Sequence, residues 1–141
     1  MSIKSDLQNY LGDVTAVAAI CSDRIFPVAL PASATRPALT FRRMPKSPHD
    51  HTLTQASGTS LATFRIMAWG DTYKSADSLG EAARQALQGY RGTWGTTKIN
   101  AVILIDDYDD FAQPQDGSDR GYFAVIHDYQ IRYAETIPTF S

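Results

Sequence analysis

The sequence predicts an α+β domain in which an antiparallel sheet of about four to five strands is covered on one face by a long helix and by N-terminal helices. Two observations predict this class. Apolar residues recur at helical spacing near the N-terminus and over residues 72–90, whereas they alternate at strand spacing elsewhere. The strands fall in adjacent groups before and after the long helix, which favours hairpins. At 141 residues the chain fits a single domain over 1–141.

The N-terminal segment predicts two short helices and an edge strand. Its first apolar residues are spaced by three and four, and Ser2 precedes them as an N-cap: Ile3, Leu7, Tyr10 and Leu11. After Gly12 and Asp13 the run "VTAVAAI" predicts a second, largely buried helix. "DRIFP" then predicts a short strand at a sheet edge, because Pro27 lacks a backbone donor.

The central segment predicts two strands and the long helix. Alternating residues predict strands over 38–44 and 59–70, separated by a polar, proline-broken loop over 45–58. Beyond them, one apolar stripe predicts a helix over 72–90, with Asp71 as its N-cap and Gly92 as its stop.

The C-terminal third predicts two strands around an acidic loop. "TKINAVILID" indicates a buried strand, 106–119 a loop, and "RGYFAVIHDYQIRYAE" a strand followed by a tail over 135–141. At about 3.3 Å per residue this last strand exceeds the usual length, so a bend or an overhang is expected. An overhanging strand would pair with a partner.

Charge and composition exclude several classes. The net charge of −2 and the pI near 5.8 argue against a protein that grips nucleic acid over a broad basic surface. The single cysteine, Cys21, cannot form an internal disulfide and is expected to be a small buried hydrophobe, which fits a reducing cytoplasm. The N-terminus has neither the apolar core of a signal peptide nor the length of a membrane span.

Aspartates are concentrated after the strand "VILID": Asp106, Asp107, Asp109, Asp110, Asp116 and Asp119. Their spacing fails the calcium loop of EF-hands, which needs alternating oxygens, a glycine and a terminal glutamate. A two-metal hydrolase gathers carboxylates from several elements, whereas these come from one. Three readings remain: a solvated loop, a surface selected for negative sign, or a metal-assisted catalytic site.

Other candidate chemistry is sparse. His49 and His51 flank Asp50 and could chelate zinc, but a third ligand is missing nearby. His127 sits in a strand and is expected to be a hydrogen-bonded core or interface histidine. Serine nucleophile motifs, phosphate-binding glycine loops and cysteine pairs are absent. Arg42 and Arg43, with Lys46 and Phe41 beside them, form the one basic cluster.

Five segments occur in a familiar order: "DRIFP", "PALTFRRM" with "DHTL", "FRIMAWGDTYKSADSLGEAARQAL", "GYRGTWG" and "RGYFAVIHDYQIRY". From about residue 5 to 134 the chain resembles the tail completion or tail terminator proteins of long-tailed, siphovirus-like phages, prophages and gene transfer agents. The resemblance implies a structural virion protein, not an enzyme, made in the bacterial host cytoplasm. It implies a hexameric ring that caps the head-proximal end of the tail tube, ends tube polymerisation and joins the head connector or stopper, with no cofactor, no catalytic residue and no membrane.

The resemblance gives the candidate residues a common purpose. DNA passes through the tail channel without specific binding, and carboxylates on its wall repel phosphate. We therefore expect the acidic loop to face the ring lumen: Asp106, Asp107, Asp109, Asp110 and Asp116. The loop over 45–58 is expected to contact the tube or connector: Lys46, His49, Asp50 and His51. The last strand is expected at the subunit interface: Tyr122, Tyr129 and Arg132.

Three alternatives remain open. A metal-assisted hydrolase would use the cluster from Asp106 to Asp110 and bind divalent metal stoichiometrically. A small nucleic-acid module would use Phe41, Arg42 and Arg43 and show salt-sensitive affinity for single strands. A different head-tail connector or minor tail subunit would share the virion location but not the capping role.

Overall fold

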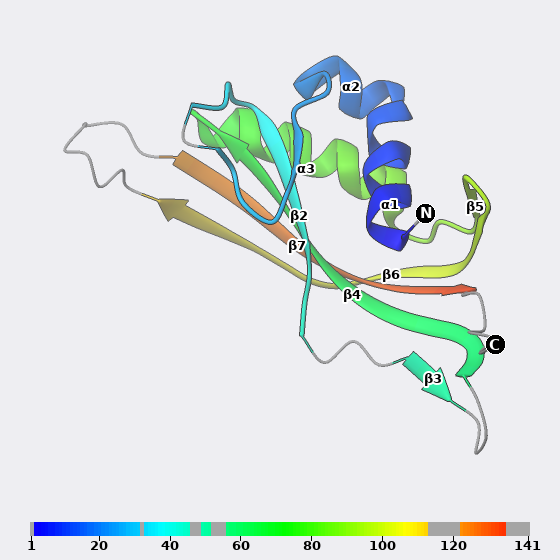
Figure 1. Cartoon of the computed structure of the whole chain (residues 1–141). Helices are drawn as coiled ribbons and strands as arrows, with labels where there is room; N and C mark the ends of the chain where they lie inside the picture. Colours follow the sequence, from blue (N-terminus) through cyan, green and yellow to red (C-terminus); the bar gives the residue numbers. More distant parts are fainter. Residues whose placement is uncertain (1, 32, 46–48, 52–55, 113–121, 135–141) are drawn as a thin grey trace.

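Three helices lie on one side of a curled sheet in the computed structural model, which describes residues 2–31, 33–45, 49–51, 56–112 and 122–134 (Figure 1). The helices are α1 (Ile3–Asp13), α2 (Thr15–Cys21) and α3 (Tyr73–Leu87). The predicted α+β class, with the long helix and the N-terminal helices on one face, is confirmed.

The sheet is built mainly from four long strands. Its seven strands are β1 (Ile25–Pro27), β2 (Ala38–Arg43), β3 (His49–His51), β4 (Ala56–Gly70), β5 (Gly92–Trp94), β6 (Thr97–Ala112) and β7 (Tyr122–Ala134). They are arranged in the order β1-β2-β4-β7-β6-β5, and β3 pairs with β4 beside β2. The pairs are antiparallel except for β1 and β2, which are parallel. β1, β3 and β5 have three residues each, so the long strands match the expected four to five.

The core lies between the helices and the sheet. Leu7 and Leu11 of α1 and Leu79 of α3 are fully buried against Phe64 of β4 and Tyr129 of β7. Their burial provides the main driving force for this packing, at about 1.5–3 kcal/mol for each large apolar side chain. Cys21 is also fully buried, which confirms its predicted place as a small hydrophobe.

The helix starts follow ordinary capping chemistry. Ser2 caps α1, as predicted, and its hydroxyl accepts from the N–H of Ser5 at 3.3 Å. The prediction of Asp71 as the cap of α3 is wrong by one residue: Thr72 is the cap and forms a reciprocal capping box with Ser75. Asp71 instead pairs with Arg36, whose Nε lies 2.6 Å from its Oδ1.

Two predicted loops are partly strand. The prediction of an acidic loop over 106–119 is wrong for residues 106–112, which continue β6 and pair with β7. Its remainder lies outside the described residues, as does the tail over 135–141. The loop predicted over 45–58 contains β3 and the start of β4, which pair with each other. In both segments the backbone pairs with a neighbouring strand, although the polar composition indicated a loop.

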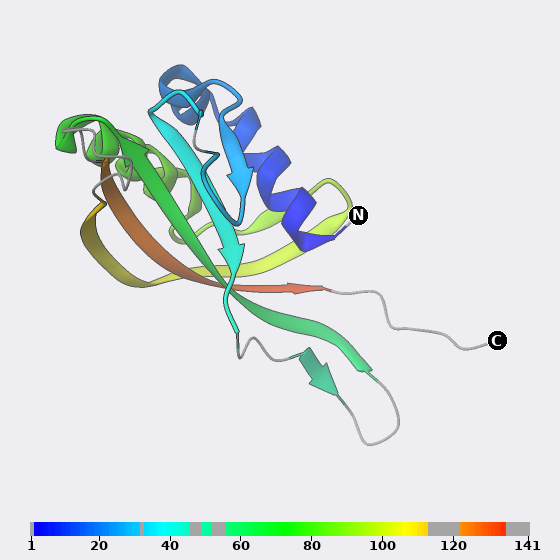
Figure 2. The same cartoon turned by 60° about the vertical axis from the view of Figure 1, so that its left-hand side comes forward.

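The last strand is central. Of the bend or overhang expected for β7, the structure has the bend and no overhang: β4 pairs with β7 over Phe123–Ala134 and β6 pairs with it over Tyr122–Tyr133. Length is accommodated by the expected bend: register shifts between Ile99 and Ala101 and between Leu104 and Asp106 accompany the curl of β6 and β7 (Figure 2). A neighbouring chain therefore cannot pair with β7 along its described length.

Candidate functional site

The outer edge of β6 is open over most of its length. β5 pairs only with Thr97–Ile99, and no other described strand lies beyond β6. The N–H of Asp107 donates to the carboxylate of Asp106 at 3.0 Å, and the N–H of Phe111 donates to that of Asp110 at 2.8 Å. These backbone donors are satisfied by local side chains in place of a neighbouring strand.

Large apolar side chains are exposed along the same strand. Ile103 is 54% exposed, Ile105 47% and Phe111 50%, with Tyr108 also exposed. The prediction of a buried strand over "TKINAVILID" is therefore wrong for Ile103 and Ile105. Ile99 and Val102 of the same segment are buried.

The aspartates of β6 divide between the two faces of the sheet. Asp107 and Asp109 pair with His127 and Val125, which lie on the helix side because both approach Gly80 of α3. Asp106 and Asp110 pair with Asp128 and Ala124 and lie on the helix-free face. The division follows from the alternation of side chains along a strand. Asp116 lies outside the described residues.

On the helix side, Asp107 lies against a buried histidine that is hydrogen-bonded to the core. Its Oδ1 lies 3.1 Å from Nε2 of His127, and Nδ1 of His127 lies 3.3 Å from the hydroxyl of Tyr129. His127 is only 3% exposed, which confirms the prediction of a hydrogen-bonded core histidine. Burial raises the pKa of Tyr129, which opposes formation of a tyrosinate nucleophile. The arrangement ties β6 to the core.

A polar cavity of about 250 Å³ opens beside Asp107 and His127, between α3 and β6. The hydroxyl of Tyr73 donates to Asp109 there, at 3.0 Å. Its lining includes carboxylates from both elements: Asp77, Glu81, Asp107 and Asp109. The pKa of Glu81 is lowered to about 2 by hydrogen bonds from Arg84 and then Gln85. The cavity is thus an acidic feature adjoining the open edge.

On the helix-free face, one ion pair crosses the middle of the sheet. Arg65 of β4 donates through Nε and Nη2 to the two carboxylate oxygens of Asp128, at 3.0 and 3.2 Å. The hydrogen bond that Arg65 donates to Asp128 is the main cause that raises the pKa of Arg65. Two parallel hydrogen bonds of this kind fix the relative orientation of the two side chains and also pair their charges. Asp106 and Asp110 extend the charged face toward the open edge.

The basic cluster lies at the opposite edge of the sheet. Arg42 and Arg43 end β2, and Arg42 is exposed on the helix-free face because it pairs with Arg65. Arg43 is on the helix side, where its Nη1 donates to the hydroxyl of Tyr133 at 3.4 Å. His49, Asp50 and His51 form β3 next to this edge. Lys46 lies outside the described residues.

The three residues expected at a subunit interface have different surroundings. Tyr129 is fully buried in the core, so it is inaccessible to a neighbouring subunit. Tyr122 is half-buried, with the guanidinium carbon of Arg36 3.9 Å from its ring centroid. Arg132 is exposed on the helix-free face of β7.

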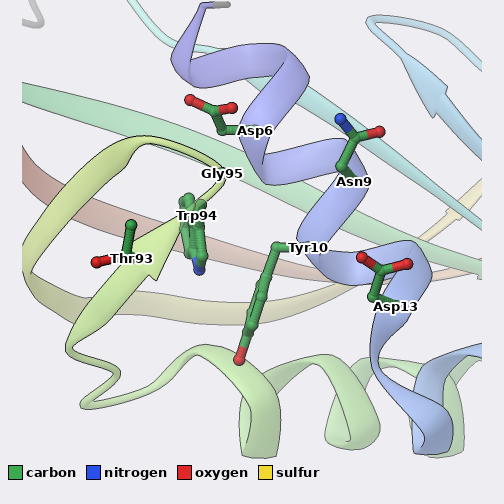
Figure 3. Close-up of a pocket in the computed structure, with 7 residues that line it drawn as sticks. All are labelled: Asp6, Asn9, Tyr10, Asp13, Thr93, Trp94 and Gly95. Carbon is green, nitrogen blue, oxygen red and sulfur yellow. The ribbon is translucent and has the colours of Figure 1, made fainter.

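A second cavity, of about 400 Å³, lies between α1 and the β5 hairpin (Figure 3). Tyr10 stacks on Trp94 there with ring centroids 5.0 Å apart, and Asp6, Asn9 and Asp13 lie along α1 beside them. The hydroxyl of Thr97 donates to Asp6. These contacts join α1 to the start of β6.

No group of three or more histidine, cysteine or acidic side chains among the described residues is placed to hold a metal ion. The side chains of His49 and His51 are outside what the structure describes. None of the described helices is both long and apolar enough to cross a membrane.

Comparison with known proteins found a matching family and a similar solved structure. The sequence model of one family, described as Tail completion protein gp17, matches residues 5–134. The chain belongs to this family of tail completion proteins. No curated protein sequence matches it. Its fold is similar to a chain in a structure described as the virion of a native gene transfer agent particle, with a TM-score of 0.62, 12% identity, and coverage of 93% of this chain and 95% of that one.

Proposed function

We propose that this chain is a structural subunit of a phage-like tail that caps the head-proximal end of the tail tube as a ring. In this position it ends tube growth and joins the tail to the head connector. Membership of the tail completion family is the observation that carries the proposal. The similar chain in a gene transfer agent virion supports the same fold for such a subunit. The polarity of the two sheet edges, acidic at β6 and basic at β2, is consistent with assembly from identical copies.

The helix-free face of the sheet is the proposed lumen wall. It presents Asp106 and Asp110 near the open edge, and their charge would oppose adhesion of the DNA backbone. Asp107 and Asp109 lie on the opposite face of β6. There they would hold the strand in place through their contacts with His127 and Tyr73. Arg65 adds no net charge to this face, since Asp128 pairs with it. The exposed Arg42 and Arg132 also lie on this face, so the proposed negative wall is confined to the segment around Asp106 and Asp110.

Contacts with the other tail and head components are proposed at the segment over 45–58. It carries Lys46, His49, Asp50 and His51 and departs from the basic end of β2. Tyr122 and Arg132 remain proposed interface residues, whereas Tyr129 acts through the core. In this role the chain needs no cofactor.

Deletion of the gene from its phage-like element tests the proposal. The expected particles are filled heads without joined tails, together with tail tubes of irregular length. Electron microscopy of the purified protein, alone and mixed with tail tubes, should show six-fold rings with a central hole. Joined particles of normal tail length after deletion would contradict the capping role, and tube ends that never acquire a ring would contradict the assembly.

A further inference from the structure

We propose that the open edge of β6, over residues 101–112, binds the β2 edge of a second copy of this chain, head to tail. In this arrangement Arg42 and Arg43 of one copy lie against the β6 aspartates of the next. The inference rests on the ring proposed above and names the surfaces that would build it.

Exposed apolar area marks β6 as an interface. Six large hydrophobic side chains are exposed in the described part of the chain, and four of them lie on this strand: Ile103, Ile105, Tyr108 and Phe111. Scattered single hydrophobics need no explanation, but a row of them along an unpaired strand edge invites association. No charged or proline residue blunts the edge between Lys98 and Asp106.

The charges of the two sheet edges indicate which edge of a second copy would bind β6. β6 has four aspartates within five positions and no basic residue after Lys98, so two β6 edges placed together would oppose like charges. The end of β2 has two consecutive arginines on the other side of the same sheet. Unlike charges therefore meet only when the β6 edge of one copy faces the β2 edge of another.

The two faces of the sheet match as well. Arg42 lies on the helix-free face, as do Asp106 and Asp110. Arg43 lies on the helix side, as do Asp107 and Asp109. If one sheet continues into the next with its helices on the same side, opposite charges meet on both faces.

The β2 edge also has a defined place for the contact. β1 covers β2 only along Leu39–Phe41 and ends at Pro27, which has no backbone donor. The contact is therefore assigned to the last residues of β2. Because the two surfaces lie on opposite edges of one sheet, the contact is heterologous, and repeating it closes a ring when the rotations complete a full turn.

Mixing two charge-reversed variants tests this arrangement. Asp106→Arg/Asp110→Arg places positive charge on both edges, whereas Arg42→Glu removes the positive charge from the helix-free face of the β2 edge. Each variant alone is expected to form rings at least about tenfold less than the parent chain, in solution or on tube ends. Mixed one to one, they should recover rings in which the variants alternate. Thermal unfolding confirms that each variant is folded.

Absence of recovery in the mixture, with rings still formed by the parent chain, overturns the head-to-tail assignment. Unimpaired rings from either variant alone overturn it as well. An affinity tag on one variant distinguishes alternating rings from rings of a single kind, because alternating rings retain both chains in fixed, equal proportion.

Cross-linking provides a second measurement that does not depend on charge. A chain with Ile105→Cys and Met44→Cys, which keeps Arg42 and Arg43 in place, should yield a ladder of covalent oligomers in rings treated with a short bismaleimide. Cys21 does not interfere, since it is buried and burial raises the pKa of its thiol. The matched control replaces Ile105→Cys by Ser78→Cys, at an exposed position of α3, and should give no ladder.

The outcomes separate this inference from the proposed function. Rings without a cross-linked ladder refute the β6–β2 contact but leave the capping ring intact. If the parent chain forms no ring even on tail tubes, the proposed function and the contact both fail.

Discussion

Asp107 and His127 join the open edge of the sheet to its core. Their Oδ1 and Nε2 atoms lie 3.1 Å apart, although the side chain of Asp107 is half exposed and that of His127 is buried. The other ring nitrogen of His127, Nδ1, lies 3.3 Å from the hydroxyl of Tyr129 in a hydrogen bond whose donor depends on the tautomer of the imidazole. The acidic segment is thereby fixed to β7, so the same strand that offers an edge to a neighbour is anchored from within.

Replacing this histidine should weaken the fold. His127→Ala leaves a cavity against α3 and removes the partner of the buried Tyr129 hydroxyl, so a loss of about 2–4 kcal/mol in the free energy of unfolding is expected. Urea denaturation measures it. The control Asp109→Asn, at an exposed residue of the same face, should change stability by less than about 1 kcal/mol. Equal effects of the two substitutions would contradict the anchoring role.

Breaking the ion pair of the helix-free face should also destabilise the chain. Asp128→Asn leaves the guanidinium of Arg65 without its carboxylate, which should cost about 1–3 kcal/mol. A double-mutant cycle with Arg65→Met measures the coupling, and the double variant should lose less than the sum of the single losses. The control is Asp110→Asn on the same face. Strict additivity would show that the pair adds no coupling energy.

Gly80 allows α3 to lie close to β7. A Cβ at this position would stand 2.9 Å from Cγ1 of Val125, a branched side chain that has little room to turn. Gly80→Ala should therefore destabilise by about 1 kcal/mol or more, although alanine favours helix elsewhere. Gly12→Ala in α1 is the matched control, because its Cβ meets no atom within 4 Å, and it should be neutral or stabilising. Thermal melts of both variants decide the matter, and a stabilising Gly80→Ala would refute the close approach.

The carboxyl group of Glu81 should titrate far below its ordinary range. Arg84, and then Gln85, lower its pKa from 4.5 to about 2. Because the folded-state pKa is lower than the unfolded one, its contribution to stability is present above about pH 4.5 and is lost as the pH falls toward 2. Carbon-detected NMR titration should show this low midpoint in the parent chain. In Arg84→Gln the midpoint should rise toward the ordinary value, and an unchanged midpoint would refute the assigned cause.

Local patterns predicted most elements of the fold. The stripe beginning at Ala76 predicted α3, and the alternation around Phe64 predicted β4, because helical and strand periods can be recognised within a few turns of chain. The cap of α3 was misplaced by one residue since Asp71 and Thr72 are both good caps by type. β3 lies in a polar segment and β5 is bounded by Gly92 and Gly95, so neither three-residue strand was predicted, whereas Ile25 and Phe26 indicated the equally short β1.

The helix-covered sheet, the burial of Cys21 and the core position of His127 are predictable from the amino-acid sequence, since these features depend on apolar spacing and residue type. Three features became visible only in the folded chain: residues 106–112 continue a strand, β7 is central, and Ile103 and Ile105 are exposed on an open edge. The physical reason is that strand order and edge position depend on hydrogen bonds between residues distant along the chain. An apolar run has the same composition whether both of its edges are paired or one is left open.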